Sequence, residues 1–191
     1  MKMKAKHLIY KLYEKDYELL GTGVYSAVFL SKKNENIVYK IGNTLEDPYL
    51  EYINSGVVNN IHFPKIYSIN KSKKYNMYLA KLEKLSSFSD VYSGSVPIKV
   101  FTEFSKAVAN GVTKFDTAWK AIGITESITE LLEYINMLCD KNSNFKLDLH
   151  RGNVMYDINN RLIITDPIAD SSFSRYSSGI EEWLEESIEN M

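Results

Sequence analysis

Three polar residues between short apolar segments place the strongest constraint on how this chain can fold. Asp148 and Asn153 stand five residues apart in a polar stretch, and Asp166 follows after one hairpin. The flanking apolar segments are only a few residues long, which is typical of short strands. Loops between such strands can bring two carboxylates and a carboxamide to face one small space. These groups suit the acceptance of a hydroxyl proton and the binding of a hard cation such as Mg²⁺.

Length and composition indicate one domain, or one domain built of two small lobes. The chain has 191 residues, and no apolar run approaches the roughly 20 residues that span a bilayer. Its lysine-rich start is interrupted too early to predict a signal peptide. The single Cys139 excludes an internal disulfide, so a reducing cytoplasm is the expected location. A net charge of −1 gives no reason to expect direct binding to nucleic acid, and without a long apolar run no membrane insertion is expected.

The N-terminal half shows the alternation of an antiparallel sheet. After a short helix over 5–18, the pattern predicts strands and turns with one further helix. A start signal at 44–48, with Thr44 placed to cap, predicts that this helix runs to about Asn54 and ends near Gly56. The predicted strands form a hairpin over 17–31, a third strand over 37–41, and two more over 62–69 and 76–82.

The C-terminal half is more helical and begins after a polar connector over 86–97. Apolar residues keep a 3.6-residue period in two segments, and the second follows a capping box at Ser127–Glu130. The sequence contains no internal repeat. The predicted elements are helices over 100–108 and 128–138, a hairpin of 154–156 with 162–164, a serine-rich loop, and an acidic helix from about Gly179.

A Gly-x-Gly turn lies inside the first predicted hairpin. Gly21, Thr22 and Gly23 leave one strand, and Tyr25 and Ser26 lead into the next. A dinucleotide fingerprint requires a helix directly after the glycines, so this context argues against one. A glycine-rich hairpin can instead lay backbone amides over nucleotide phosphates. Two glycines in a hairpin are also ordinary turn chemistry, so this motif alone leaves both interpretations open.

Lys40 lies within the apolar strand over 37–41. Because successive side chains of a strand point to opposite faces, Lys40 points away from the face that Tyr39 and Ile41 share. It can therefore lie beneath the glycine turn, where it would pair with phosphate. The alternative is an outward lysine on a half-exposed strand.

Taken together, these motifs resemble the protein-kinase-like superfamily, over nearly the whole chain. The chain is most similar to the short phage-encoded serine/threonine protein kinases that modify host proteins early in infection. The segments that carry this resemblance are Leu20–Val28, Val38–Gly42, Asp148–Met155 and Ile164–Pro167.

The resemblance implies an α+β, two-lobed protein-kinase-like fold in a single domain over 1–191. An N-lobe over about 1–85 would hold a five-stranded antiparallel sheet with one helix. A minimal, mainly helical C-lobe over about 86–191 would hold the catalytic loop and the metal-binding aspartate.

The resemblance also implies how ATP is bound. Gly21, Thr22 and Gly23, with the nearby Tyr25 and Ser26, would cover the nucleotide. Lys40 would pair with the α- and β-phosphates, and the hinge from Glu83 to Leu85 would bind adenine through its backbone. The acid that fixes Lys40 should lie on the predicted helix that starts at 44–48, where Glu51 is preferred and Glu46 and Asp47 are the alternatives.

For catalysis, the resemblance implies that Asp148 deprotonates the acceptor hydroxyl while Asn153 and Asp166 hold Mg²⁺. Lys146-Leu147 replaces the His-Arg of eukaryotic kinases, so clamping of a phosphorylated activation loop is not expected. His150 replaces a lysine two residues after the catalytic aspartate, and it either supports the loop by hydrogen bonding or steadies the transferred phosphate.

The chain after Asp166 departs from eukaryotic kinases as well. Pro167-Ile168 replaces Phe-Gly, and the proline restricts a flip at this position. Only 25 residues follow Asp166, too few for a long activation segment. We therefore expect an enzyme that is constitutively active or controlled externally. A flexible serine-rich loop over 171–178 is expected, and autophosphorylation there is the alternative.

The function expected from sequence is transfer of phosphate from ATP to serine and threonine residues of bacterial host proteins, with Mg²⁺ as the metal. A small-molecule kinase of the aminoglycoside or choline type is a second hypothesis, which His150 and the short C-lobe favour. A pseudokinase that serves as a binding module is the third. The four residues Lys40, Asp148, Asn153 and Asp166 argue against it, because a binding module does not require them.

Overall fold

The structure is a computed structural model that describes residues 12, 14–15, 17–23, 26–31, 34–42, 47–73, 77–111 and 114–170. The described chain forms two compact units. The N-terminal unit contains the described residues through Ser55 and Lys65–Lys84. The C-terminal unit contains Gly56–Pro64 and the described residues from Leu85 onward. Several predictions lie wholly or mostly outside the described residues, namely the helix over 5–18, Tyr25, Thr44, Glu46, the serine-rich loop and the acidic helix.

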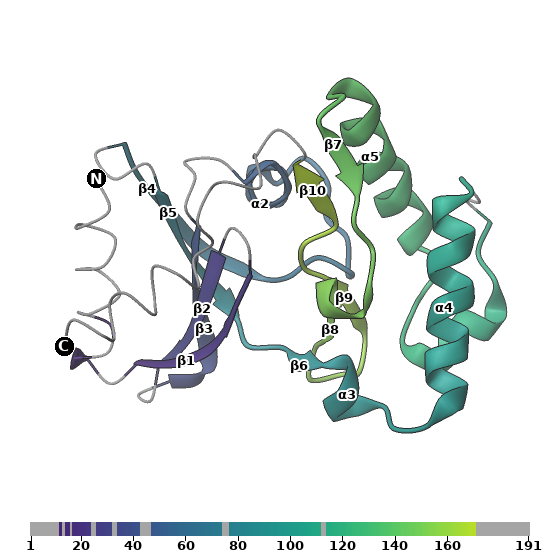
Figure 1. Ribbon diagram of the computed structural model, residues 1–191, viewed down its shortest axis with the longest axis horizontal. Helices are drawn as coiled ribbons and strands as arrows, with labels where there is room; N and C mark the ends of the chain where they lie inside the picture. The colour runs from purple at the N-terminus through teal and green to yellow at the C-terminus, as the bar shows by residue number, and fades with distance from the viewer. Residues whose placement is uncertain are drawn as a thin grey trace. The chain divides into compact units, whose positions relative to one another are not determined.

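The N-terminal unit is built on a five-stranded sheet in which every pairing is antiparallel. The strand order is β1-β2-β3-β5-β4 (Figure 1). This confirms the α+β class and the antiparallel sheet expected from the sequence. The strands are β1 Tyr17–Thr22, β2 Ser26–Ser31, β3 Asn34–Gly42, β4 Ile66–Ser72 and β5 Met77–Glu83.

Strand alternation divides the core of this unit between the two faces of the sheet. One cluster takes Ala27 and Phe29 from β2, Ile41 from β3 and Met77 from β5. The other takes the alternate residues of the same strands together with Leu50 of helix α2 (Pro48–Ser55). Because Val38 belongs to this second cluster, Lys40, two residues further along β3, points to the face that α2 covers.

Helix α2 begins at Pro48 and ends at Ser55, close to the predicted end. The Asp47 carboxylate accepts a hydrogen bond from the Leu50 N–H at 3.0 Å, which satisfies one of the free amides of the first turn. Gly56 follows with φ of 69°, a left-handed conformation that glycine adopts without strain. Within the described residues, Asp47 is therefore the residue that caps α2.

The C-terminal unit is mainly helical, with two small antiparallel sheets of order β6-β8-β9 and β10-β7. The two long helices are α4 and α5 (Figure 1). Phe104 of α4 and Ile128 and Ile135 of α5 are fully buried in the core of this unit. Its elements are β6 Ser86–Ser87, α3 Phe88–Val91, α4 Ser95–Ala109, the 3₁₀ helix η1 Thr117–Ile122, α5 Ile128–Lys141, β7 Phe145–Leu147, the 3₁₀ turn η2 Arg151–Asn153, β8 Val154–Tyr156, β9 Leu162–Ile164 and β10 Ile168–Asp170.

Three predictions for local structure are wrong. The connector over 86–97 contains β6 and α3, and α4 already begins at Ser95. Ser127 precedes α5 without a side-chain cap, and its hydroxyl bonds the Thr125 hydroxyl at 2.9 Å instead. The fourth strand begins at Ile66, so His62 lies outside the sheet and is fully buried in the C-terminal unit.

Among the described residues, none of the helices combines the length and the apolar character that crossing a membrane would require.

Candidate active site

Two backbone hydrogen bonds hold Asp166 between the two ends of the catalytic loop. The Thr165 N–H donates to the Asn153 carbonyl at 3.0 Å, and the Asp148 N–H donates to the Pro167 carbonyl at 2.8 Å. Strands β7 and β10 extend this connection, with Leu147 opposite Ile168. The residues on both sides of Asp166 are therefore fixed to the loop, so the structure brings the backbone of Asp166 close to that of Asp148 and Asn153.

The Asn153 carboxamide fixes the position of the Asp148 carboxylate. Its Nδ2 donates to the Asp148 carbonyl at 2.8 Å and to Oδ2 of the Asp148 side chain at 3.1 Å. Since the nitrogen of this amide is directed at Asp148, the oxygen Oδ1 is the atom that remains to coordinate a cation. The Asp148 side chain is 44% exposed, so an acceptor hydroxyl can reach it.

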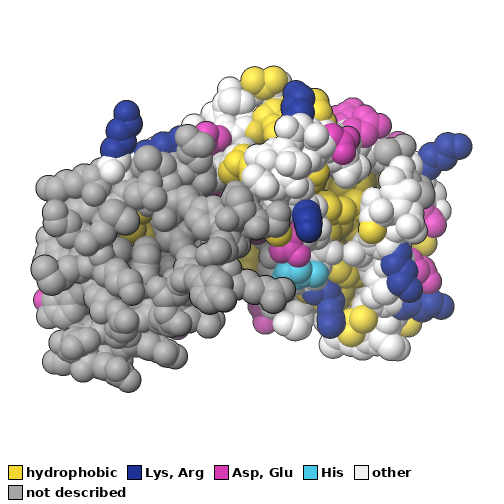
Figure 2. Space-filling view, turned by 45° about the horizontal axis from the view of Figure 1, so that its top comes forward, with side chains coloured by type: hydrophobic (Ala, Val, Ile, Leu, Met, Phe, Trp, Pro, Cys, Tyr) yellow, Lys and Arg dark blue, Asp and Glu magenta, His cyan; other side chains and the backbone are white. Residues whose placement is uncertain are grey.

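His150 supports the catalytic loop through its ring nitrogen Nδ1. This atom accepts a hydrogen bond from the Gly152 N–H at 3.0 Å and so caps η2. The neutral ring then carries its proton on Nε2, which lies 3.6 Å from Oδ1 of Asp148. Figure 2 shows a histidine side chain together with acidic and basic side chains on one face of the protein. Of the two roles that the sequence left open for His150, the observed hydrogen bond corresponds to support of the loop.

Gly152 permits this capping contact because it has no side chain. A Cβ at position 152 would lie 2.8 Å from Cε1 and 3.0 Å from Nδ1 of His150. We expect Gly152→Ala to displace the imidazole and lower the free energy of unfolding by about 1 kcal/mol, the usual cost of a lost helix cap. Thermal denaturation measures this, with Gly21→Ala as the control, since a Cβ at Gly21 meets nothing within 4 Å. Equal melting temperatures for the two variants would contradict the capping role.

The C-terminal unit offers oxygen donors for a metal without a cluster of charged ligands. The described ranges contain no group of three or more His, Cys, Asp or Glu side chains that could hold a metal ion. Mg²⁺ is commonly held by one or two carboxylates together with phosphate oxygens and water. An Asn153 oxygen and an Asp166 carboxylate fit that donor chemistry, whereas they would be too few for an all-protein metal site.

In the N-terminal unit, Lys40 forms an ion pair with Asp47. Nζ of Lys40 lies 3.3 Å from Oδ2 of Asp47, and only 9% of the Lys40 side chain is exposed. The Tyr78 hydroxyl donates to the same carboxylate oxygen at 2.9 Å. Lys40 of β3 is therefore held by the residue directly before α2, and that residue is in turn held by Tyr78 of β5.

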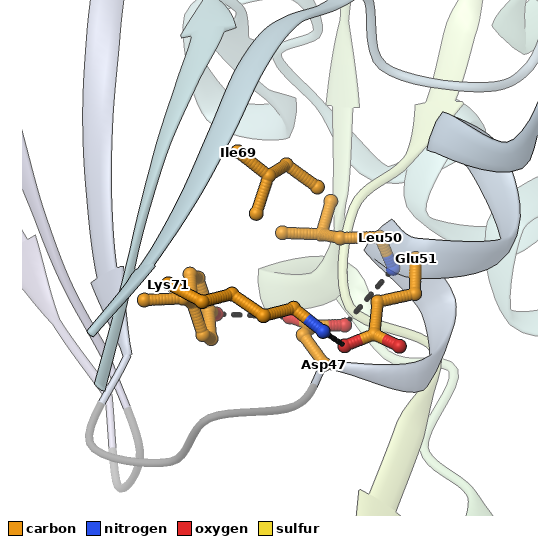
Figure 3. Close-up of a pocket in the computed structure, with 6 residues that line it drawn as sticks. Asp47, Leu50, Glu51, Ile69 and Lys71 are labelled. Atoms are coloured by element: carbon orange, nitrogen blue, oxygen red, sulfur yellow. Dashed lines mark hydrogen bonds and ion pairs between the residues drawn. The ribbon is translucent and has the colours of Figure 1, made fainter. Parts of the chain in front are cut away.

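The choice of Glu51 as the partner of Lys40 is therefore wrong, and Asp47 takes this place. Glu51 pairs instead with Lys71 of β4, and both side chains are more than one-third exposed. Figure 3 shows the Lys71 and Glu51 side chains pointing toward each other in a shallow hollow, with Leu50 and Ile69 beside them. Helix α2 starts only after Asp47, so Glu51 comes one turn too late to meet Lys40.

The surroundings of Asp47 favour its charged form. Burial alone would raise the pKa of Asp47, but the Lys40 ammonium, the Leu50 N–H and the Tyr78 hydroxyl offset burial and lower the pKa below its ordinary value. The carboxylate is thus charged near neutral pH and attracts Lys40. Tyr78 was not identified from the sequence. No sequence pattern pointed to it; in the structure Gly42 leaves room for its ring, because a Cβ at that position would lie 2.0 Å from a ring carbon.

The glycine turn closes as a tight hairpin. The Gly23 N–H donates to the Ser26 carbonyl at 2.7 Å, and Thr22 pairs with Ala27 across the two strands. Gly21 and Gly23 are both exposed, so their backbone is open to a ligand. The register of β1 shifts between Leu19 and Gly21. The contribution assigned to Tyr25 lies outside the described residues.

The predicted hinge uses two of its amides within the protein. The N–H of Glu83 donates to the Lys65 carbonyl at 3.1 Å, and the N–H of Lys84 donates to the Asn36 carbonyl at 2.9 Å. The Glu83 carboxylate also accepts from the Lys65 N–H at 2.7 Å. These two N–H groups therefore stabilise the sheet in this structure. The assignment of adenine binding to Glu83 and Leu85 remains a prediction for their carbonyls and the Leu85 N–H.

Three features of the chain are together those of a kinase, a phosphotransferase that uses ATP. They are a strand lysine held by an acid, a glycine hairpin, and a loop aspartate whose loop is joined to the segment of a second aspartate. Over residues 4–188 the chain matches the family described as bacteriophage T7 protein kinase 0.7, and it belongs to that family. No curated protein sequence matches the chain. The resemblance to phage protein kinases expected from the sequence motifs is thereby confirmed.

Proposed function

We propose that this protein is an ATP- and Mg²⁺-dependent serine/threonine protein kinase that phosphorylates proteins of a bacterial host in the host cytoplasm. Its N-lobe would span about 1–85 and its C-lobe about 86–191. The observation that carries the proposal is the pair of backbone hydrogen bonds that fix Asp166 between Asp148 and Asn153. Membership of a protein kinase family supports a protein as the acceptor.

Asp148 is the proposed general base. Its carboxylate is fixed by Asn153 and is 44% exposed, so it can orient a serine or threonine hydroxyl and accept its proton. A base of this kind contributes by its position, which is fixed here because the Asp148 N–H is hydrogen-bonded to the carbonyl of Pro167, directly before β10.

Lys40, Asn153 and Asp166 are the proposed phosphate and metal residues. The Asn153 oxygen and the Asp166 carboxylate would hold Mg²⁺, which would neutralise charge on the phosphates of ATP, the donor of the phosphoryl group. The Lys40 ammonium, fixed by Asp47, would attract the α- and β-phosphates. The Gly21–Gly23 turn would place backbone amides over the nucleotide.

The experiment that tests this function follows phosphate from γ-labelled ATP into a bacterial lysate. We expect label on serine and threonine of lysate proteins, and we expect chelation of divalent cations by EDTA to stop the transfer until Mg²⁺ is restored. A reaction with the purified protein alone measures autophosphorylation, including that of the serines over 171–178. Label on lysate metabolites, or on aminoglycosides added to the lysate, without label on proteins would favour a small-molecule kinase. Nucleotide binding without any transfer would favour a pseudokinase.

A further inference from the structure

His62 is a buried histidine that the proposed chemistry does not use. Its side chain has no exposed surface, and its backbone N–H donates to the Asn60 side chain at 3.0 Å. The Asn60 amide in turn donates to the Ser127 carbonyl at 2.7 Å, just before α5. Asn60 is also buried, so the segment that carries His62 is firmly held within the C-terminal unit.

The hydrogen bonds of the ring define its tautomer. Nε2 accepts from the Thr125 N–H at 3.2 Å and lies 2.8 Å from the Thr125 hydroxyl, so this nitrogen carries no proton. The proton of the neutral ring is then on Nδ1, which donates to the Leu162 carbonyl at 2.6 Å. Burial, the largest cause, lowers the pKa of His62 and thereby favours the same neutral form.

These contacts cover the open edge of strand β9. The strand is the last of its sheet, so one edge has no neighbouring strand within that sheet. On that edge the Leu162 N–H donates to the Gly123 carbonyl at 3.0 Å, and the Ile164 N–H donates to the His62 carbonyl at 3.0 Å. With the bond from its ring to Leu162, His62 engages both ends of the strand that leads directly to Asp166.

We propose that His62 is a positioning residue for phosphoryl transfer. Its neutral imidazole and its backbone carbonyl set the position of β9, and β9 sets the position of Asp166 two residues beyond Ile164. This inference rests on the proposed function, because Asp166 matters only if it holds the metal. Groups that orient metal ligands contact neither substrate nor metal. Their mutation nevertheless commonly lowers activity or metal affinity by about 10- to 100-fold.

The test compares His62→Asn with His62→Gln. The amide nitrogen of asparagine can replace Nδ1 and donate to the Leu162 carbonyl, whereas that of glutamine lies one carbon further out. We expect His62→Gln to lower kcat by about 10- to 100-fold with little change in the KM for the protein substrate, and His62→Asn to retain most of the activity. Val108→Ala on α4 is the control for a general loss of core packing in the same unit.

Two measurements besides activity accompany the comparison. Amide hydrogen exchange of Leu162 and Ile164 should accelerate in His62→Gln and not in Val108→Ala. Mn²⁺ binding in the presence of ATP, followed by electron paramagnetic resonance, should weaken in the same variant. Equal kcat, exchange and Mn²⁺ binding for the asparagine and glutamine variants, both folded, would overturn the proposal.

Thr125→Val provides the test if a His62 variant fails to fold. It removes the hydroxyl contact to Nε2, together with the bond between the Thr125 and Ser127 hydroxyls, and leaves the backbone N–H in place. We expect a lower kcat and faster exchange at Leu162, and unchanged values would contradict the positioning role. If the wild-type protein transfers no phosphate, the proposed function fails. The exchange rates then still show whether His62 holds β9.

Discussion

Replacing Asp148 by alanine is expected to lower the rate of phosphoryl transfer by about 10²- to 10⁴-fold, the usual contribution of a positioned general base. The carboxylate accepts a hydrogen bond from Asn153 and is exposed enough to meet a hydroxyl. Alanine removes the proton acceptor and leaves the backbone bond from residue 148 to Pro167 available. Single-turnover transfer from labelled ATP to a lysate protein measures the effect.

Asp140→Ala is the matched control for this change. Asp140 lies near the end of α5 on the surface of the same unit, and its removal deletes an equal charge away from the catalytic loop. We expect near-normal transfer from this variant. A protein with alanine at position 148 that stays folded and transfers phosphate at the wild-type rate would rule out Asp148 as the base.

Replacing Asp47 by asparagine is expected to reduce transfer by about 10²-fold, the typical effect of a misplaced binding group. Asparagine retains one oxygen, which can still cap the Leu50 N–H, but an uncharged amide nitrogen takes the place of Oδ2, the atom that accepts from Tyr78 and attracts Lys40. Loss of one partner of a buried ion pair should also lower the free energy of unfolding by about 3 kcal/mol. Activity assays and denaturant unfolding measure the two effects.

Glu51→Gln is the control, because Glu51 pairs with Lys71 at the surface and such pairs contribute little. We expect this variant to differ from wild type by less than about 1 kcal/mol and to retain full activity. An Asp47→Asn protein that behaves like Glu51→Gln would show that Asp47 does not position Lys40.

The same pair gives the wild-type protein a pH dependence of stability. The folded state lowers the pKa of Asp47 below the roughly 3.9 of an unfolded aspartate, so the carboxylate stabilises the fold above about pH 4. This contribution is lost as the pH falls through the lowered pKa of the folded state. Unfolding measured from pH 7 downward should therefore show a smaller acid-induced loss in Asp47→Asn than in wild type. Parallel pH curves would contradict the charge state assigned to Asp47.

Local sequence patterns predicted the elements whose periodicity reports directly on burial. The segment 17–31 alternates because its strands have two faces with different surroundings, the segment 37–41 is a short apolar run, and the structure places them as β1, β2 and β3. The apolar stripe over 128–138 predicted α5 for the same reason. The connector over 86–97 was missed because its strand and its first helix are too short to show a period.

The sequence by itself determined which chemical groups the protein carries, since Asp148, Asn153 and Asp166 are identified by their type and spacing along the chain. Only the tertiary structure decided that Asp47, and not Glu51, holds Lys40, because the start of α2 sets which acid faces β3. It also decided the place of His62, whose partners Thr125 and Leu162 are 63 and 100 residues away. Local patterns report burial and turns, whereas contacts between distant segments depend on how those segments pack.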